Sequence, residues 1–286
     1  MHKLSAAAVC GAIAFVCSGV RAQEGAGASN LVEEVRQSVS VGAYAEIQSA
    51  YLARGIVVDA HPFSAQFANA DFKLGWFGRA GAYVWSVTSL SSTGQGAAKR
   101  NAYNEADYNL YYAYDLELGE SWTLENRLAR QWVTLPGYHG RASTICEWHA
   151  AQTLHNPWIT PYWLLRHAER PARWNYWDIG LKRSFDIAEG FTFTVDFFGE
   201  LGDADHFLSQ YGPKPAEPGS RYHGGLQALN LVLRFDYKLT DNLGVYAFAR
   251  QFDIVSEDAR DAVKASSAPE AKRDLTVFGV GMALNF

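Results

Sequence analysis

The sequence predicts an all-β protein, a transmembrane antiparallel up-and-down β-barrel of about 12 strands. Three observations lead to this prediction. Apolar side chains recur at every second position from residue 41 to the end of the chain, the period of a strand with one apolar face. Short and long connections alternate between these strands. Aromatic residues make up 14% of the chain, yet no apolar run of about 18 residues follows the N-terminal segment, so no helical span is expected.

The N-terminus has the features of a cleaved secretory signal peptide over residues 1–22. A short basic start, Met1-His2-Lys3, precedes a run of apolar and small residues, and Val20-Arg21-Ala22 fits the small-x-small cleavage pattern. A lipoprotein signal that uses Cys17 is the alternative, although the usual Leu three places earlier is missing. Residues 23–40 are small and polar, and we expect a periplasmic leader or a plug inside the lumen.

Composition excludes several classes of protein. Removal of the signal takes Cys10 and Cys17 away and leaves Cys146 alone, so no intramolecular disulfide can form. The formal net charge of −5 argues against a nucleic-acid partner. No motif indicates a cofactor, because Gly279-Val280-Gly281 lacks the strand-to-helix context of a nucleotide fingerprint.

The expected strands are each long enough to cross a bilayer. They are Val41–Arg54, Phe63–Trp76, Arg79–Leu90, Glu105–Leu118, Trp122–Thr134, Thr144–Leu154, Trp158–His167, Trp174–Phe185, Phe191–Leu201, His223–Leu239, Leu243–Phe252 and Asp274–Phe286.

The connections between these strands support a membrane barrel. Five short turns lie at residues 77–78, 119–121, 155–157, 186–190 and 240–242. The connections between them are longer, at residues 55–62, 91–104, 135–143, 168–173, 202–222 and 253–273. Barrels of the outer membrane have short periplasmic turns and long outer loops. An even number of strands then places both termini of the barrel on the periplasmic side.

Charged residues fix which face of each strand points to the lumen. In the strand 105–118, Tyr108, Leu110 and Tyr112 alternate with Asp107, Asn109 and Tyr111. A carboxylate that faced lipid near the midplane would cost several kcal/mol, so the charged face must point inward. The same reasoning predicts lumen-lining charges of both signs: Glu46, Asp107, Asp115, Glu117, Glu125, Arg127, Lys182, Asp196, Arg234 and Asp236, with Arg54, Glu200, Lys238 and Arg250 in the same class.

Two stretches resemble known families. The last strand ends on Phe286 and resembles the C-terminal strand of bacterial outer-membrane barrels, in which the final Phe belongs to the signal read by the assembly machinery. Ser49–Gly55, followed by Pro62, is similar to the Tyr-x-x-Arg-Gly opening of uncharacterised porin-like families. The resemblance implies a barrel in contact with outer-membrane lipid and recognised through Phe286 by the barrel-assembly machinery. It implies no particular solute.

The predicted function is passive diffusion of small polar solutes through a hydrated lumen. Neither sign of charge dominates the predicted lining, so ion selectivity is not predicted. A salt-bridged lumen without conductance is the alternative, in a structural or surface-binding barrel. In that case the long loops 202–222 and 253–273 would contact a partner or fold inward as a constriction.

A lipid-modifying enzyme is a further alternative. A Ser/His pair could form between His206 and Ser209, or between His139 and Ser143. No stretch resembles the His-x-Ser-Asn-Gly motif of the barrel phospholipases, so no catalytic residue is assigned. Asp203-Ala204-Asp205-His206 could hold a divalent cation, although ligands confined to one loop are weak support, and no metal site is assigned.

Overall fold

The computed structural model describes residues 38–90, 104–135, 144–214, 221–265 and 272–286. The predicted signal peptide and all but the end of the predicted leader lie outside the described residues, so both stay predictions. Residues 41–286 form one compact unit, separate from residues 1–40. This unit contains the barrel.

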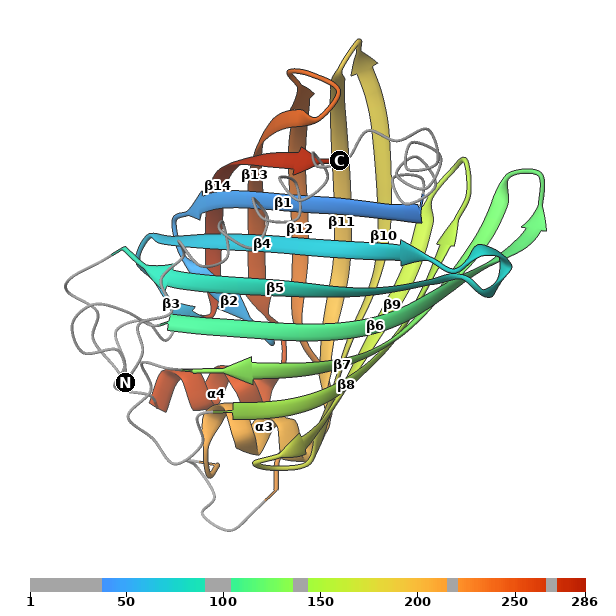
Figure 1. The fold of residues 1–286 in the computed structure, drawn as a ribbon. Coiled ribbons are helices and arrows are strands. Elements are labelled where there is room, and N and C mark those ends of the chain that lie inside the picture. Colours follow the sequence, from blue (N-terminus) through green and yellow to red (C-terminus); the bar gives the residue numbers. More distant parts are fainter. Residues whose placement is uncertain (1–37, 91–103, 136–143, 215–220, 266–271) are drawn as a thin grey trace, which may run out of the picture. The chain divides into compact units, whose positions relative to one another are not determined.

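The strands close into a 12-stranded antiparallel barrel (Figure 1), as the sequence predicted. Each strand pairs with its neighbours in the chain, and β1 pairs with β14 to close the barrel. The barrel strands are β1 (Val39–Gln48), β4 (Phe63–Lys73), β5 (Arg79–Ser89), β6 (Asn104–Gly119), β7 (Trp122–Thr134), β8 (Thr144–His155), β9 (Thr160–Arg170), β10 (Trp174–Ala188), β11 (Phe191–Gly202), β12 (Gly225–Lys238), β13 (Leu243–Ile254) and β14 (Asp274–Asn285).

The outer face of the barrel is apolar because side chains alternate along every strand. In β6, Leu110 is 57% exposed, whereas its inward neighbours Asp107 and Asn109 are buried. In β14, Phe278 is 61% exposed and Val277 is buried. In water, such a continuous apolar surface would have to be covered, so the exposed side chains mark a face built for lipid.

Aromatic rings and one arginine lie at the barrel end that carries the short turns. Trp158 is 69% exposed and meets Trp122 edge to face, with ring centroids 5.7 Å apart. Arg183 lies on the outer face of β10, where it donates to the carbonyls of Pro157 and Trp158. A guanidinium on the lipid-facing side is tolerated there because the side chain reaches the polar turn.

Small residues in the wall make room for inward aromatic rings. A Cβ atom on Gly281 would lie 2.5 Å from Cζ of Tyr246, and one on Gly81 would lie 2.4 Å from Cζ of Tyr111. The chain ends inside this packing, because the backbones of Val41 and Phe286 exchange two hydrogen bonds of 2.9 and 2.8 Å. The terminal Phe286 is therefore fixed in the ladder, with its side chain 62% exposed.

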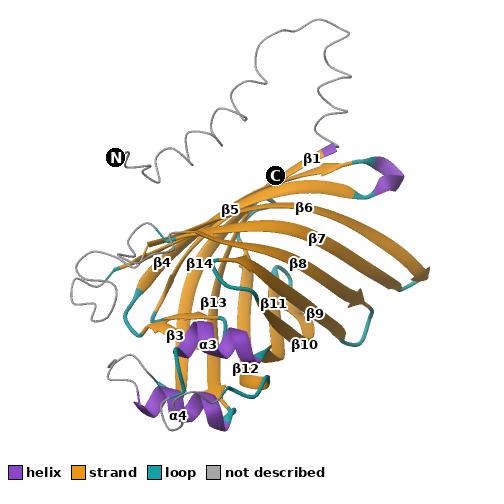
Figure 2. Cartoon of the chain, turned by 90° about the horizontal axis from the view of Figure 1, so that it is seen from below, coloured by secondary structure: helices purple, strands orange, loops and turns teal. Residues whose placement is uncertain are grey.

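The opposite end of the barrel is filled by inserted elements (Figures 1 and 2). They are a hairpin of β2 (Tyr51–Ala53) and β3 (Ile56–Asp59), and the helices α3 (Ala204–Tyr211) and α4 (Glu257–Ala265). Neither described helix is long and apolar enough to cross a membrane. At the turn-bearing end, a single 3₁₀ turn, η2 (Gly75–Phe77), joins β4 to β5.

Two predicted boundaries are wrong in an informative way. The strand predicted over Val41–Arg54 ends at Gln48, and the chain then turns into the separate two-stranded sheet of β2 and β3. The connection predicted as long at residues 168–173 is short, because β9 continues to Arg170 and β10 begins at Trp174. The other strands agree with the prediction within a few residues.

Candidate functional site

The ten predicted lumen residues all lie on the strand faces opposite the exposed apolar side chains. They do not converge on one point. The other nine lie along the barrel wall, in ion pairs, stacking contacts or hydrogen bonds or, for Lys182, opposite a carboxylate on the next strand. Asp107 lies beside the inserted hairpin. The two regions have different properties.

Arg79 organises the first wall group. Its guanidinium lies 3.1 Å from Asp115 and 2.9 Å from Glu125, and Asp71 is at 4.0 Å. His155 lies 3.6 Å from Glu125. Glu117, one position from the turn, accepts a hydrogen bond from Thr123. Each of these pairs is partly exposed, as expected for a wall in contact with water.

Two further groups line the rest of the wall. Arg234 pairs with Asp236 at 2.7 Å and stacks 3.8 Å above the ring of Tyr246, whose hydroxyl donates to Glu46. Lys182 and Asp196 are register partners between β10 and β11, and Tyr162 donates to Asp196. Arg127 lies 4.0 Å from the centroid of Tyr111. The wall therefore carries both ion pairs and charged side chains that are held by hydrogen bonds or aromatic contacts alone.

The hairpin β2–β3 folds inward and turns at Arg54 and Gly55. Their φ angles are 50° and 76°, the left-handed pair of a two-residue type I′ turn. The Arg-Gly of the Tyr-x-x-Arg-Gly motif is thus the tip of the hairpin. Gly suits this conformation, and a non-Gly residue such as Arg adopts it at some cost.

The tip of the hairpin is held by residues from the far side of the barrel. Arg54 forms an ion pair with Glu147 of β8 at 2.9 Å. The carbonyl oxygen of Gly55 accepts hydrogen bonds from Gln227 of β12, at 3.0 Å, and from Tyr211 of α3, at 3.3 Å. Because β2 and β3 begin at the β1–β4 side, these contacts mean that the hairpin crosses the lumen.

Electrostatics reinforce the Arg54 contact. Burial lowers the pKa of Arg54, but the carboxylates of Glu147, Glu105 and Asp107 outweigh it and hold the pKa above its ordinary value. The side chain of Glu147 is fully buried and also contacts His149 at 2.9 Å. A buried carboxylate of this kind depends on its cationic partner, so Arg54 is a structural anchor of the hairpin.

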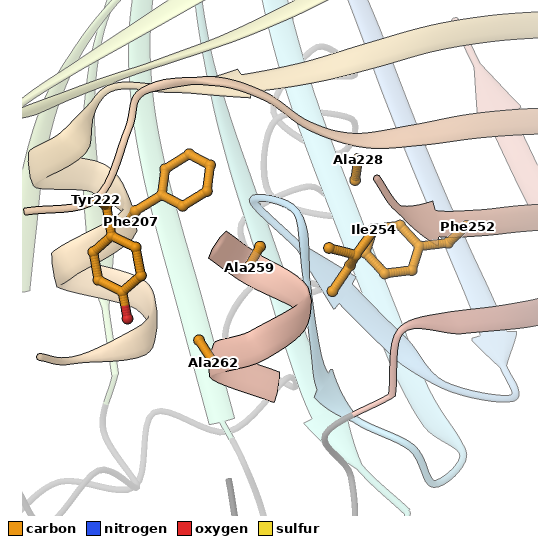
Figure 3. Close-up of a cluster of buried hydrophobic side chains, with 7 residues drawn as sticks. All are labelled: Phe207, Tyr222, Ala228, Phe252, Ile254, Ala259 and Ala262. Carbon is orange, nitrogen blue, oxygen red and sulfur yellow. The ribbon is translucent and has the colours of Figure 1, made fainter. Parts of the chain in front are cut away.

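An apolar cluster supports the hairpin from behind (Figure 3). It joins α3, α4 and the ends of β12 and β13, and Leu52 and Val57 of the hairpin pack against it. The buried members are Phe207, Tyr222, Ala228, Phe252, Ile254, Ala259 and Ala262. Both long loops therefore place their described helices against the hairpin, in line with the predicted inward constriction.

A cavity of about 420 Å³ lies beside the hairpin tip. Aromatic side chains of β1, β4 and β5 line part of it, including Tyr44, Phe67, Tyr83 and Trp85. The charged lining residues are Arg54, Asp107, Arg166, Asp178, Glu200 and Arg250.

His206 does not form the catalytic or metal site considered from the sequence. Its ring is fully buried between Trp174 and Tyr176, with centroid distances of 5.0 and 4.7 Å. Asp203 is the N-cap of α3, where its side chain accepts from the backbone of His206. No metal-binding group occurs among the described residues. The pair His139 and Ser143 lies outside them.

The buried His206 predicts a pH dependence. Burial, followed by the charge of Arg54, lowers its pKa from 6.5 to about 4, against the opposing charge of Asp203. Above pH 6.5 the imidazole is neutral whether buried or released. As the pH falls from 6.5 to about 4, only a released imidazole takes up a proton, which favours release of α3 and the hairpin by up to about 3 kcal/mol.

We therefore expect acid to open the lumen over this range, measured as single-channel conductance against pH. The matched variant His206→Phe keeps the aromatic packing and removes the titrating group. If His206→Phe shows the same pH response as the unmodified protein, other groups cause it.

Sequence reasoning missed Arg79, Glu105, Glu147 and Arg166 as lumen residues. Each has the parity of an inward position. Glu147 and His149 alternate with the outward Trp148, and Arg166 alternates with Leu165 and His167. The alternation of inward and outward positions is present in the sequence. However, the β8 and β9 segments mix apolar and polar residues on both faces, so the sequence does not show which face of these strands points to the lumen.

The chain was compared with known protein families, curated proteins and solved structures, and only the solved structures match. No model of a protein family matches the chain, and no curated protein does. An outer membrane channel from Pseudomonas putida F1 aligns over 87% of this chain and 96% of its own, with a TM-score of 0.53 and 10% identity. The KdgM porin (8% identity, TM-score 0.46) covers 86% of this chain and 99% of its own.

The NanC porin (10% identity, TM-score 0.46) covers 85% of this chain and 98% of its own. At these identities the likeness shows the fold alone. The fold shared with the Pseudomonas channel agrees with the barrel that the strand pattern predicted.

Proposed function

We propose that the protein is an outer-membrane channel for passive diffusion of small polar solutes, and that the hairpin β2–β3 limits its resting conductance. One observation carries the proposal: a closed barrel with an apolar outer face encloses a charged inner face and a cavity. Such an inner face favours water and polar solutes.

The proposed path runs along the ion-paired wall groups to the cavity at the hairpin tip. Along the wall, charged and hydroxyl groups offer hydrogen bonds to a passing solute. At the tip, the solute meets Arg54 and its anchors. Release of Arg54 from Glu147 would therefore join the cavity to the outer mouth.

Location and assembly belong to the same proposal. The short turns and both barrel termini lie at one end, which suits a periplasmic orientation. The exposed outer side chains would contact outer-membrane lipid, and the exposed Phe286 would be recognised by the barrel-assembly machinery.

Single-channel recording of the refolded protein from residue 23 onward tests the proposal. We expect small conductance steps with frequent closures, because the hairpin crosses the lumen. A gel of boiled and unboiled samples shows first that a compact barrel has formed. A folded, inserted protein without steps at any voltage or pH would contradict the channel proposal.

The closed hairpin also favours a second candidate, a non-conducting barrel that binds a partner through its outer loops. The same recording separates the two candidates. Absence of steps in a correctly folded barrel would support partner binding, and steady steps would exclude it as the sole function.

A further inference from the structure

One sector of the outer, lipid-facing surface carries charge. Most outward side chains of the described strands are apolar, but β7 places Arg130 on this face. Arg130 is the register partner of Leu110 on β6 and of Trp148 on β8, which are 57% and 42% exposed. Side-chain alternation therefore points its guanidinium outward. Because a charged side chain among acyl chains is costly, its height along the barrel matters.

The two ends of β7 show that Arg130 lies at the outer interface. Trp122 lies at the short turns, where it contacts Trp158, and Trp132 lies near the other end of the strand. A strand tilted by about 40° rises about 2.5 Å per residue along the membrane normal. The two rings are thus about 25 Å apart, which is the height of the apolar band of such barrels. Arg130 lies just inside the upper ring, at the level of the lipid headgroups.

The guanidinium of Arg130 is held in place but not saturated. Its Nη2 lies 2.8 Å from Glu169. Its Cζ lies 4.9 Å from the ring centroid of Trp148 and 5.9 Å from that of Trp132. The indole of Trp148 donates to Glu169 at 3.1 Å. Nη1 of Arg130 is buried and has no hydrogen-bond partner among the described residues. An unused donor on a fixed guanidinium suits an anion that approaches from the membrane.

Positive charge exceeds negative charge in this sector. Arg170, at the end of β9, is exposed and is the register partner of Cys146. Arg173, just before β10, is also exposed, and neither arginine has an ion-pair partner in the described part of the chain. Glu169 is the only carboxylate on the described outward faces of β7, β8 and β9. Asp203, beyond the next strand, caps α3.

We propose that this outer-rim cluster binds the phosphate group of a lipid in the outer leaflet. The cluster consists of Arg130, Trp132, Trp148, Glu169 and Arg170. Guanidinium donors match phosphate oxygens, and indole rings favour the boundary between headgroups and acyl chains. The short connection between β9 and β10 leaves the cluster open toward the membrane. The inference goes beyond the channel proposal and shares with it only the orientation of the barrel in the outer membrane.

Native mass spectrometry of the full barrel in a neutral detergent tests the site without requiring conductance. The probe is phosphorylated lipid A, and dephosphorylated lipid A is its matched counterpart. We expect the phosphorylated form to bind about tenfold more tightly or better. Arg170→Gln should weaken its binding about fivefold, because one cation near the membrane surface is lost. Arg170→Lys keeps the charge and should keep most of the affinity. Arg130→Gln should weaken binding at least as much as Arg170→Gln.

Arg183→Gln is the matched control, because Arg183 also lies on the outer face but at the short turns, where it donates to Pro157 and Trp158. It should bind phosphorylated lipid A as the unmodified barrel does. Equal affinities of the unmodified and Arg170→Gln barrels, both heat-modifiable on gels, would overturn the proposal. So would equal binding of the two lipids.

Two further outcomes would also overturn the lipid proposal. Displacement of the lipid by an equal concentration of inorganic phosphate would indicate a site for a free ion. Retention of a second copy of the chain in place of lipid, lost in Arg170→Gln, would indicate an interface between barrels. A barrel that binds phosphorylated lipid A but gives no conductance steps would contradict the channel proposal alone. A conducting barrel without preference for the phosphorylated lipid would contradict the lipid proposal alone.

Discussion

Replacement of residues 52–57 by a Gly-Ser-Gly turn is expected to raise the single-channel conductance roughly threefold or more, because it removes the segment that crosses the lumen. The replaced segment contains the tip residues Arg54 and Gly55, which contact β8, β12 and α3. None of the barrel strands is altered, because β1 ends at Gln48 and β4 begins at Phe63. The barrel should therefore still fold.

A matched replacement of the β12–β13 turn, residues 239–242, controls for general loosening. That turn lies at the opposite end of the barrel and contacts no part of the hairpin in the described structure. We expect the conductance of this turn variant to equal that of the unmodified protein. An unchanged conductance in the hairpin variant would show that the hairpin does not limit the path.

The barrel could be predicted from sequence because lipid imposes a strict rule on each strand. A charged side chain near the midplane must face inward, so Asp107 and Asp115 in β6, or Arg234 and Asp236 in β12, reveal the orientation of the whole strand. The apolar face of β14 then follows from Phe278, Val280 and Met282. The ten predicted charges kept this parity in the structure, although their role in conduction stays a prediction.

The hairpin could not be predicted because it obeys the same period of two. Tyr51 and Ala53 continue the alternation of β1 in sequence, but they belong to another sheet and pack inside the barrel. Local pattern does not distinguish a strand that faces lipid from one that faces the lumen. The partners of Arg54 are also distant in sequence, since Glu147 is 93 residues away. Only closure of the barrel brings them together.

The ion pair between Arg54 and Glu147 should control how often the lumen opens. Arg54→Gln leaves the buried Glu147 and Asp107 without their guanidinium, so we expect the closed state to lose about 3 kcal/mol or more. Glu147→Gln should cost less, about 1–2 kcal/mol, because Glu105 and Asp107 still attract Arg54. Open and closed dwell times in single-channel records give both values.

The double variant tests whether these costs arise from one contact. If the pair acts as a unit, the second substitution adds little, and the coupling energy from the cycle should equal the smaller single cost, about 1–2 kcal/mol. Additive effects would mean that the two side chains hold the hairpin independently. Arg166→Gln provides a further control, because its partner Asp178 lines the same cavity but does not touch the hairpin in the described structure. A change in dwell times as large as that of Arg54→Gln would place the control of opening in the cavity charges as a whole, rather than in the hairpin anchor.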